Sequence, residues 1–167
     1  MSGLDVRVVA NIVLRQAQIE RVAVTNLHLN KALYFMHVDR LRECGQPLVS
    51  AKIEAWEYGP VFREVYNQFK RYRGGAIRDL ARRPDYETGE LVVAWDDIPA
   101  DYQDYIRELA RFYIRIPASV LVDMSHAKGG AWDAVWNNSG PINLGMEITD
   151  DKIRQFELTS GARIHRQ

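Results

Sequence analysis

The chain has 167 residues, of which 47% are hydrophobic and 26% are charged, a balance typical of a folded protein rather than a disordered one. Its 22 basic and 22 acidic side chains cancel, so nucleic acid is not the expected main partner, because proteins that bind phosphate backbones are usually basic. This length fits one domain with a sizeable core, and we predict a single domain over residues 1–167.

The N-terminal segment predicts a helix over residues 5–18. Valine and isoleucine recur there in a helical rather than an alternating pattern, and Asp5 is a suitable N-cap. The segment lacks the basic start and apolar run of a signal peptide, and nowhere do about 18 apolar residues follow one another. We therefore expect a cytoplasmic protein that makes no membrane contact.

The run over residues 27–44 predicts the central helix of the fold. Thr25 precedes it as a candidate N-cap, and Gly45 follows it as the usual residue for a left-handed helix end. Ala32–Met36 in its middle is apolar on every side, so the other helices are expected to pack around it. The single cysteine, Cys44, lies near the end of this run, which predicts a packed thiol.

The stretch KIEAWEYGPV, at residues 52–61, predicts a hinge before a new helix. Proline lacks an N–H and disfavours the helical conformation in the preceding residue, so Gly59 and Pro60 predict a sharp helix start. From Pro60 to Phe69 apolar residues recur at a spacing of four, opposite a polar face. Two glycines at residues 74 and 75 are expected to end this helix.

Two short strands are expected after residue 75. The best candidates are Ala76–Arg78 and Glu90–Ala94, and the segment between them is rich in turn-forming residues. We expect them to pair as a small antiparallel ribbon, which must lean on the helices because two strands alone are marginally stable.

Further helices are expected over four segments, the first of which has the clearest amphipathic pattern of the chain. In chain order they are residues 99–116, residues 117–126, a segment that carries Trp132 and Trp136 and ends at residues 137–141, and a last helix capped by Thr149. We expect a frayed tail over residues 159–167. Together the elements predict a mainly α fold: a single compact helical domain with a small antiparallel β element.

Motifs for catalysis, cofactors or metals do not occur in the sequence. The four histidines, at positions 28, 37, 126 and 165, lack the spacing that would bring two ligands to one metal, and there is no phosphate-binding loop or nucleophile elbow. Ser125 and His126 are adjacent on an expected helix and so do not face each other. We predict that the chain is not an enzyme and has no catalytic, cofactor-binding or metal-binding residues.

Glu54 and Glu57 are three residues apart and invite an acid-and-base interpretation. Without a sugar-binding or metal context, ordinary salt bridges are the favoured interpretation, with Lys31, Lys52 or Arg63 as partners. A further interpretation is a hydrolase that uses Glu54 and His126, which would require these two side chains to converge in a cleft.

Three segments of the chain resemble one protein family. They read KALYFMH, KIEAWEYGPVFREVYNQFK and LVDMSHAKGGAWDAVW, and over about residues 27–158 they resemble the Panacea domain, the SocA-like antitoxin family of bacteria and phages. The resemblance implies that the residues matching the family motif form a fixed scaffold: Ala55, Trp56, Tyr58, Gly59, Pro60, Val61, Leu121, His126 and Trp132. Within it we expect Trp56 to be buried against the central helix, near Leu33 or Met36, and His126 to be a hydrogen-bonded packing residue rather than a base.

Members of this family are antitoxins, so the resemblance implies that the chain neutralises a cognate protein toxin by binding it directly. One branch of the family also works as a proteolytic adaptor that hands its toxin to an AAA+ protease. Delivery of the toxin to such a protease is therefore expected as a second step after binding. The expected partners are thus a protein toxin and an AAA+ protease. No cofactor is expected.

The basic cluster from Lys70 to Arg83 leaves an alternative open, a small nucleic-acid-associated regulator. Basic side chains with Tyr72 interleaved suit nucleic acid, whereas the acidic residues among them favour a solvated helix end. An acidic patch on a protein partner would match the cluster equally well.

The ribbon expected over residues 86–94 is the candidate toxin-binding surface. We expect one of its faces to lie on the helices and one of its edges to be open, and open edges invite strand pairing. The candidate contact residues are Arg78, Arg82, Leu91 and Val93. The alternatives are a solvated hairpin that only covers part of the core, and a binding site in the loop at residues 127–132.

Overall fold

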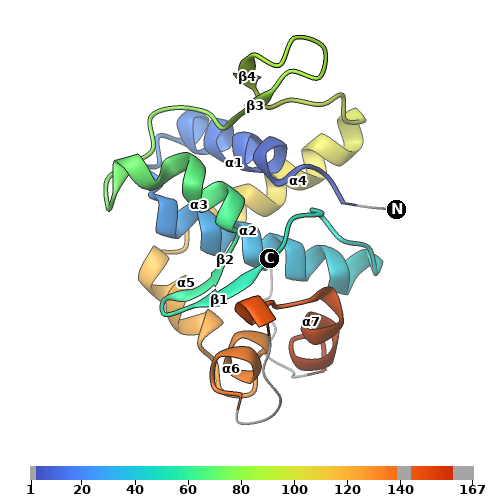
Figure 1. The fold of residues 1–167 in the computed structure, drawn as a ribbon. Coiled ribbons are helices and arrows are strands. Elements are labelled where there is room, and N and C mark those ends of the chain that lie inside the picture. Colours follow the sequence, from blue (N-terminus) through green and yellow to red (C-terminus); the bar gives the residue numbers. More distant parts are fainter. Residues whose placement is uncertain (1–2, 139–143, 160–167) are drawn as a thin grey trace.

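The computed structural model describes residues 3–138 and 144–159, and these are folded mainly into helices with two small antiparallel hairpins (Figure 1). The predicted fold class, mainly α with a minor β element, is therefore confirmed. In chain order the elements are α1 (Val6–Glu20), α2 (Asn26–Cys44), β1 (Glu54–Trp56), β2 (Gly59–Val61), α3 (Arg63–Phe69), the 3-10 helix η1 (Lys70–Tyr72), β3 (Arg82–Pro84), β4 (Leu91–Val93), α4 (Ala100–Ile114), α5 (Ala118–Ser125), α6 (Ala131–Trp136), η2 (Leu144–Met146) and α7 (Asp150–Phe156).

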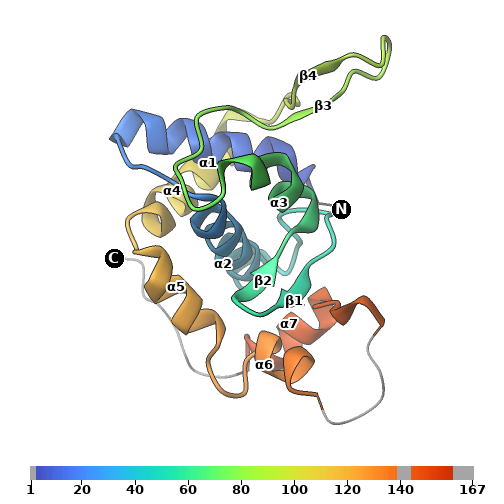
Figure 2. The same cartoon turned by 60° about the vertical axis from the view of Figure 1, so that its left-hand side comes forward.

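Helix α2 runs through the middle of the molecule, as the sequence predicts (Figure 2). The hydroxyl of Thr25 accepts a hydrogen bond from the His28 N–H at 3.1 Å, and Gly45 ends the helix with a φ of 67°. Strand β2 and helices α1, α3, α4, α5 and α7 all contact α2. Because neighbours surround it, its side chains from His28 to Asp39 are all buried.

Helix α1 packs along α4, and both cover the same side of α2. Asp5 caps α1 as predicted, accepting the Arg7 N–H at 2.9 Å. The apolar face of α4 is buried, and the hydroxyl of its Tyr113 donates to Asp39 at 2.6 Å. The helix therefore supplies both apolar contact and a partner for the buried carboxylate of α2.

The predicted helix start at Gly59 and Pro60 is wrong. Strands β1 and β2 pair as a hairpin with Glu54 opposite Val61, and α3 begins only at Arg63. A proline is tolerated at the edge of a two-stranded hairpin, so the missing N–H that favours a helix start also permits this strand. Local propensity did not distinguish the two outcomes.

The second hairpin forms between other residues than those predicted. Arg82–Pro84 pairs with Leu91–Val93, whereas Ala76–Arg78 forms no strand and Ala76 makes only an isolated bridge with Thr25. The backbone of Ala81 is bound by the side chain of Asn11, which sets the place where pairing begins. The predicted strand from Glu90 is thus confirmed and its partner is corrected.

Cys44 is exposed at the end of α2, so the prediction of a packed thiol is also wrong. The predicted helix end at residues 137–141 and the tail at residues 159–167 fall largely outside the described residues. Over residues 3–138 and 144–159, no helix is both long enough and apolar enough to cross a membrane.

Candidate functional site

The motif residues Ala55–Val61 form hairpin β1–β2, which lies on α2 and meets α5. Gly59 has a φ of 110° and is buried. A Cβ at this position would lie 2.5 Å from the Ser125 hydroxyl and 2.7 Å from Cε of Lys31. Only glycine fits this close approach, which explains why the hairpin and α5 can share one surface of α2.

Lys31 lies fully buried beneath β2. Its ammonium group donates to the Pro60 carbonyl at 2.9 Å. Burial lowers the pKa of Lys31 to about 7, because removal from water disfavours the charged form. The lysine is therefore a structural tether for the strand that the Gly-Pro pair forms.

Trp56 is only partly buried and its ring packs on α3, so the prediction that it is buried against the central helix near Leu33 or Met36 is wrong. Side chains alternate along a strand, and the inward position is taken by its neighbour Ala55. The Trp56 ring instead meets Tyr66 edge to face at 4.8 Å, and the Arg63 guanidinium lies 5.7 Å from its centre. Trp56 thus forms part of the protein surface, beside Tyr66 and Arg63.

The second half of the motif forms an aromatic stack against this hairpin. His126 stacks on Trp132 at 3.9 Å, and Trp132 stacks on Trp136 at 5.7 Å. The Trp132 indole donates to the Trp56 carbonyl at 2.7 Å, and Leu121 is fully buried nearby on α5. The distant parts of the motif therefore meet in one contact.

His126 is a packing residue, as predicted. Its pKa is lowered, chiefly by desolvation and then by the charge of Lys31. Its Nε2 is buried and has no hydrogen-bond partner among the described residues, which suits a neutral ring held by stacking.

Glu54 forms the salt bridge with Arg63 that the sequence suggested. The two guanidinium contacts measure 2.8 and 2.7 Å, and these hydrogen bonds lower the pKa of Glu54. Such a carboxylate stays ionised and is poorly suited to accept and return protons near neutral pH. In the part of the chain that the structure describes, no group of three or more His, Cys, Asp or Glu side chains is placed to hold a metal ion.

A pocket of about 450 Å³ opens between hairpin β1–β2, the start of α2 and the α3–η1 segment. We call it the Trp56 pocket; its walls include Leu27, Trp56, Tyr58, Tyr66, Lys70 and Arg73. The sequence did not predict it, because the three segments that form it are far apart in the chain. The two aromatic residues of the Ala55–Val61 motif, Trp56 and Tyr58, were the one available signal.

The candidate contact residues Arg82, Leu91 and Val93 lie on hairpin β3–β4, which projects past α1 and away from the helices (Figure 2). Leu91 is 65% exposed, and Tyr86 near the tip is 85% exposed. Arg82 is exposed and Val93 is partly buried. The structure therefore brings these residues together on one projecting element.

Arg78 lies outside that hairpin, on the exposed segment that leads into it. Arg83 is buried at the hairpin base, where it binds Asp5 and Asp96, each at 3.1 Å. The basic cluster from Lys70 to Arg83 is thus divided: Lys70 and Arg73 line the Trp56 pocket, Arg71 and Arg78 are exposed on the segment before the hairpin, Arg82 is exposed on the hairpin and Arg83 is in a buried ion-pair network.

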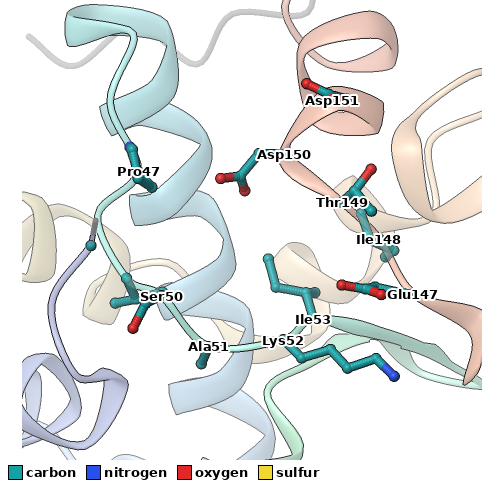
Figure 3. Close-up of a pocket in the computed structure, with 12 residues that line it drawn as sticks. Pro47, Ser50, Ala51, Lys52, Ile53, Glu147, Ile148, Thr149, Asp150 and Asp151 are labelled. Carbon is teal, nitrogen blue, oxygen red and sulfur yellow. The ribbon is translucent and has the colours of Figure 1, made fainter. Parts of the chain in front are cut away.

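A second pocket, of about 390 Å³, lies between residues 47–53 and residues 147–151, which face each other across it (Figure 3). Three carboxylates, from Glu147, Asp150 and Asp151, line it together with Lys52. Asp150 also binds the buried His37 at 2.7 Å. In this segment the sequence pattern predicted only Thr149 as the cap of the last helix, and the structure confirms it.

Comparison with known proteins gives two matches. The model of the family described as antitoxin SocA-like, Panacea domain, matches residues 29–133. The antitoxin SocA of Caulobacter vibrioides (strain NA1000 / CB15N) is 36% identical over 153 residues, which cover 91% of this chain and 81% of that relative. No solved structure matches the chain.

Proposed function

From the premise that the chain belongs to the family of SocA-like antitoxins with a Panacea domain, we propose that it neutralises a protein toxin by binding it directly. The observation that carries the proposal is the identity to an antitoxin along almost the whole chain rather than over one motif. The motif residues that contact one another, such as Trp56 and Trp132, support it, because they form a scaffold rather than a reaction centre. The chain acts by binding in the cytoplasm, not by catalysis.

Hairpin β3–β4 is the surface that we assign to the toxin. Leu91 and Val92 are both exposed on β4 and point to opposite faces of the hairpin, and Arg82 on β3 pairs with Val93. A two-stranded hairpin has unpaired backbone groups at its outer edges, which a partner strand can bind. Apolar contact, backbone pairing and the charge of Arg82 and Arg78 would then act together.

The test is to express the chain together with each protein encoded immediately beside it. We expect one of these proteins to arrest growth alone, the arrest to be relieved by the chain, and the two purified proteins to elute as one complex. Growth arrest that persists beside the folded chain for every neighbour would overturn the proposal.

The double variant Arg78→Glu with Arg82→Glu tests the assigned surface. The matched control is Arg107→Glu with Arg154→Glu, which changes the net charge equally at exposed positions on α4 and α7. We expect the hairpin variant to bind the toxin at least about 10-fold more weakly and the control to bind as the wild type does. Equal binding by both variants would move the search to the loop at residues 127–132.

Delivery of the toxin to an AAA+ protease is the second step of the proposal. Its readout is the half-life of the toxin in cells. We expect the chain to shorten that half-life in a strain with the protease and to leave it unchanged in a strain without it. A toxin that is stabilised by the chain in both strains would leave neutralisation by binding as the whole function.

A further inference from the structure

We propose that the Trp56 pocket is a second anchor on this protein, which takes one large apolar side chain from an acidic segment of the toxin. The inference rests on the proposed function, because it names the chemistry of the partner. It concerns a different surface from hairpin β3–β4. Its basis is the apolar exposure, charge, backbone conformation and rigidity of the pocket.

Apolar side chains remain exposed around the pocket. Leu27 is 41% exposed, Tyr58 is 63% exposed and Tyr66 is 37% exposed, although Leu27 belongs to the most deeply buried helix of the fold. Tyrosine and tryptophan offer large contact areas at a small entropic cost and are enriched at binding surfaces. At about 450 Å³ the space is large enough for a bulky side chain and its neighbours.

The charge of the pocket selects an acidic partner. Its lining contains three basic residues, Lys31, Lys70 and Arg73, against one acidic residue, Glu57. Lys70 and Arg73 are exposed, and neither forms an ion pair with another of the described residues. Carboxylates placed beside an apolar anchor would therefore meet unpaired cations at the rim.

Arg73 is held in a strained backbone conformation at this rim, with φ of 52° and ψ of −123°. Glycine is the residue that favours such a position, and Gly74 and Gly75 follow directly. Strain of this kind costs about 1–3 kcal/mol and is found preferentially at binding and catalytic sites. Because an arginine at this position lowers stability, we infer that its side chain contributes to binding.

The wall of the pocket is fixed before any partner binds. The Asn26 amide donates to the Tyr66 carbonyl at 3.1 Å, and the Asn30 amide donates to Asn26 at 2.9 Å. The Asn30 carbonyl oxygen accepts the Phe62 N–H at 2.9 Å, which ties α3 to α2. A rigid wall lowers the entropy lost on binding.

The two proposed contacts flank the same helix. On α3, Tyr66 lines the Trp56 pocket, whereas the Gln68 side chain binds the backbone of Arg82 at the hairpin base through contacts of 3.0 and 2.9 Å. One partner can therefore engage the hairpin and the pocket together, which strengthens binding through effective concentration. The pocket of Figure 3 is the poorer choice for an acidic segment, because Glu147, Asp150 and Asp151 would repel it.

The experiment measures the affinity of the purified full chain for the toxin identified by growth arrest. The variants are Lys70→Glu with Arg73→Glu, and Arg73→Gly alone, beside the control Arg107→Glu with Arg154→Glu. We expect the pocket double variant to bind about 100-fold more weakly and the control to bind as the wild type does. We expect Arg73→Gly to bind about 10-fold more weakly and yet to unfold at a higher temperature, because the strain is relieved.

The outcomes separate this inference from the proposed function. If the wild type and the pocket variants bind the toxin equally, and the hairpin variant does not, the pocket assignment is wrong and the antitoxin function stands. If no neighbouring protein binds the wild type, both fall. Binding of a labelled ten-nucleotide thymidine strand that Lys70→Glu with Arg73→Glu abolishes, without any loss of toxin affinity, would assign the pocket to nucleic acid and overturn the proposal.

Discussion

Asn11 and Ala81 exchange two hydrogen bonds: the Asn11 amide donates to the Ala81 carbonyl at 3.0 Å, and the Ala81 N–H donates to the Asn11 carbonyl oxygen at 2.7 Å. The same amide also donates to the Ala94 carbonyl at 2.9 Å, so one buried side chain of α1 holds both strands of hairpin β3–β4 at their base. The hairpin is attached to the body by a polar contact in an apolar environment.

Asn11→Ala should lower the free energy of unfolding by about 2–4 kcal/mol, because it removes three hydrogen bonds and leaves buried backbone groups without partners. Urea unfolding measures this loss, and hydrogen exchange should speed up at residues 81 and 94. Asn67→Ala, at an exposed position on α3, is the control and should leave stability within about 0.5 kcal/mol of the wild type. A loss shared equally by the two variants would contradict the role of Asn11.

Gly59→Ala should destabilise the protein by about 2–4 kcal/mol, since the new methyl group would collide with Ser125 and Lys31 at a backbone angle that disfavours alanine. Gly74→Ala is the matched control, because a Cβ at Gly74 meets no atom within 4 Å. Thermal unfolding of the two variants compares them directly. Similar melting temperatures would show that β2 can move away from α5 at little cost.

Lys31→Met should remove a pH dependence from stability. Lysine has a pKa near 10.5 in an unfolded chain, and burial lowers the pKa of Lys31 to about 7 in the folded protein. Between these values the unfolded chain binds more protons, so the wild type gains stability as pH rises from about 7 towards 10 and loses it as pH falls.

The stability of the wild type relative to Lys31→Met should therefore increase by about 2–4 kcal/mol across this window, because a tenfold difference in proton affinity between the folded and unfolded chain is worth about 1.4 kcal/mol. Urea unfolding of both proteins at pH 6, 8 and 9.5 makes the comparison, and the lost bond to Pro60 adds an offset that does not vary with pH. A constant gap between the two curves would mean that Lys31 reaches water in the folded state.

Arg63→Ala should lower the melting temperature at neutral pH and leave it unchanged in acid. Hydrogen bonds from Arg63 lower the pKa of Glu54 below its ordinary value, so their stabilisation is complete above the unfolded pKa of about 4.3 and is lost as pH falls through the folded pKa. Melting temperatures of the wild type and the variant, measured from pH 7 down to pH 3, should converge at the acid end. A difference in melting temperature that widens in acid would show that another group holds the Glu54 carboxylate.

Local signals were sufficient to predict most of the helices, although not the start of α3. Thr25 begins α2 and Gly45 ends it, and Asp5 and Thr149 are the N-caps of α1 and α7. Each of these residues acts on the backbone within a few positions of itself. The motif that resembled SocA-like antitoxins was equally reliable, and the family match confirms it.

The errors arose where residues far apart in sequence decide the structure. Pro60 lies in a strand since Lys31, 29 positions earlier, binds its carbonyl, and Ala81 is placed by Asn11, 70 positions earlier. Trp56 faces outward because Ala55 takes the inner side of the strand. The Trp56 pocket could not be predicted for the same reason: its walls come from α2, β1–β2 and α3–η1, which only the tertiary fold brings together.

The separation between the fixed base and the tip of hairpin β3–β4 makes the tip a natural insertion point for protein engineering. The turn is closed by its own bonds, in which Asp85 accepts the Glu87 and Thr88 N–H groups at 2.9 Å, so the body of the fold does not depend on its length. Each doubling of a flexible loop costs only about 0.6 kcal/mol in closure entropy. An epitope tag or a fluorophore-binding peptide placed between Glu87 and Thr88 should therefore leave the helices folded while reporting on whatever approaches the hairpin.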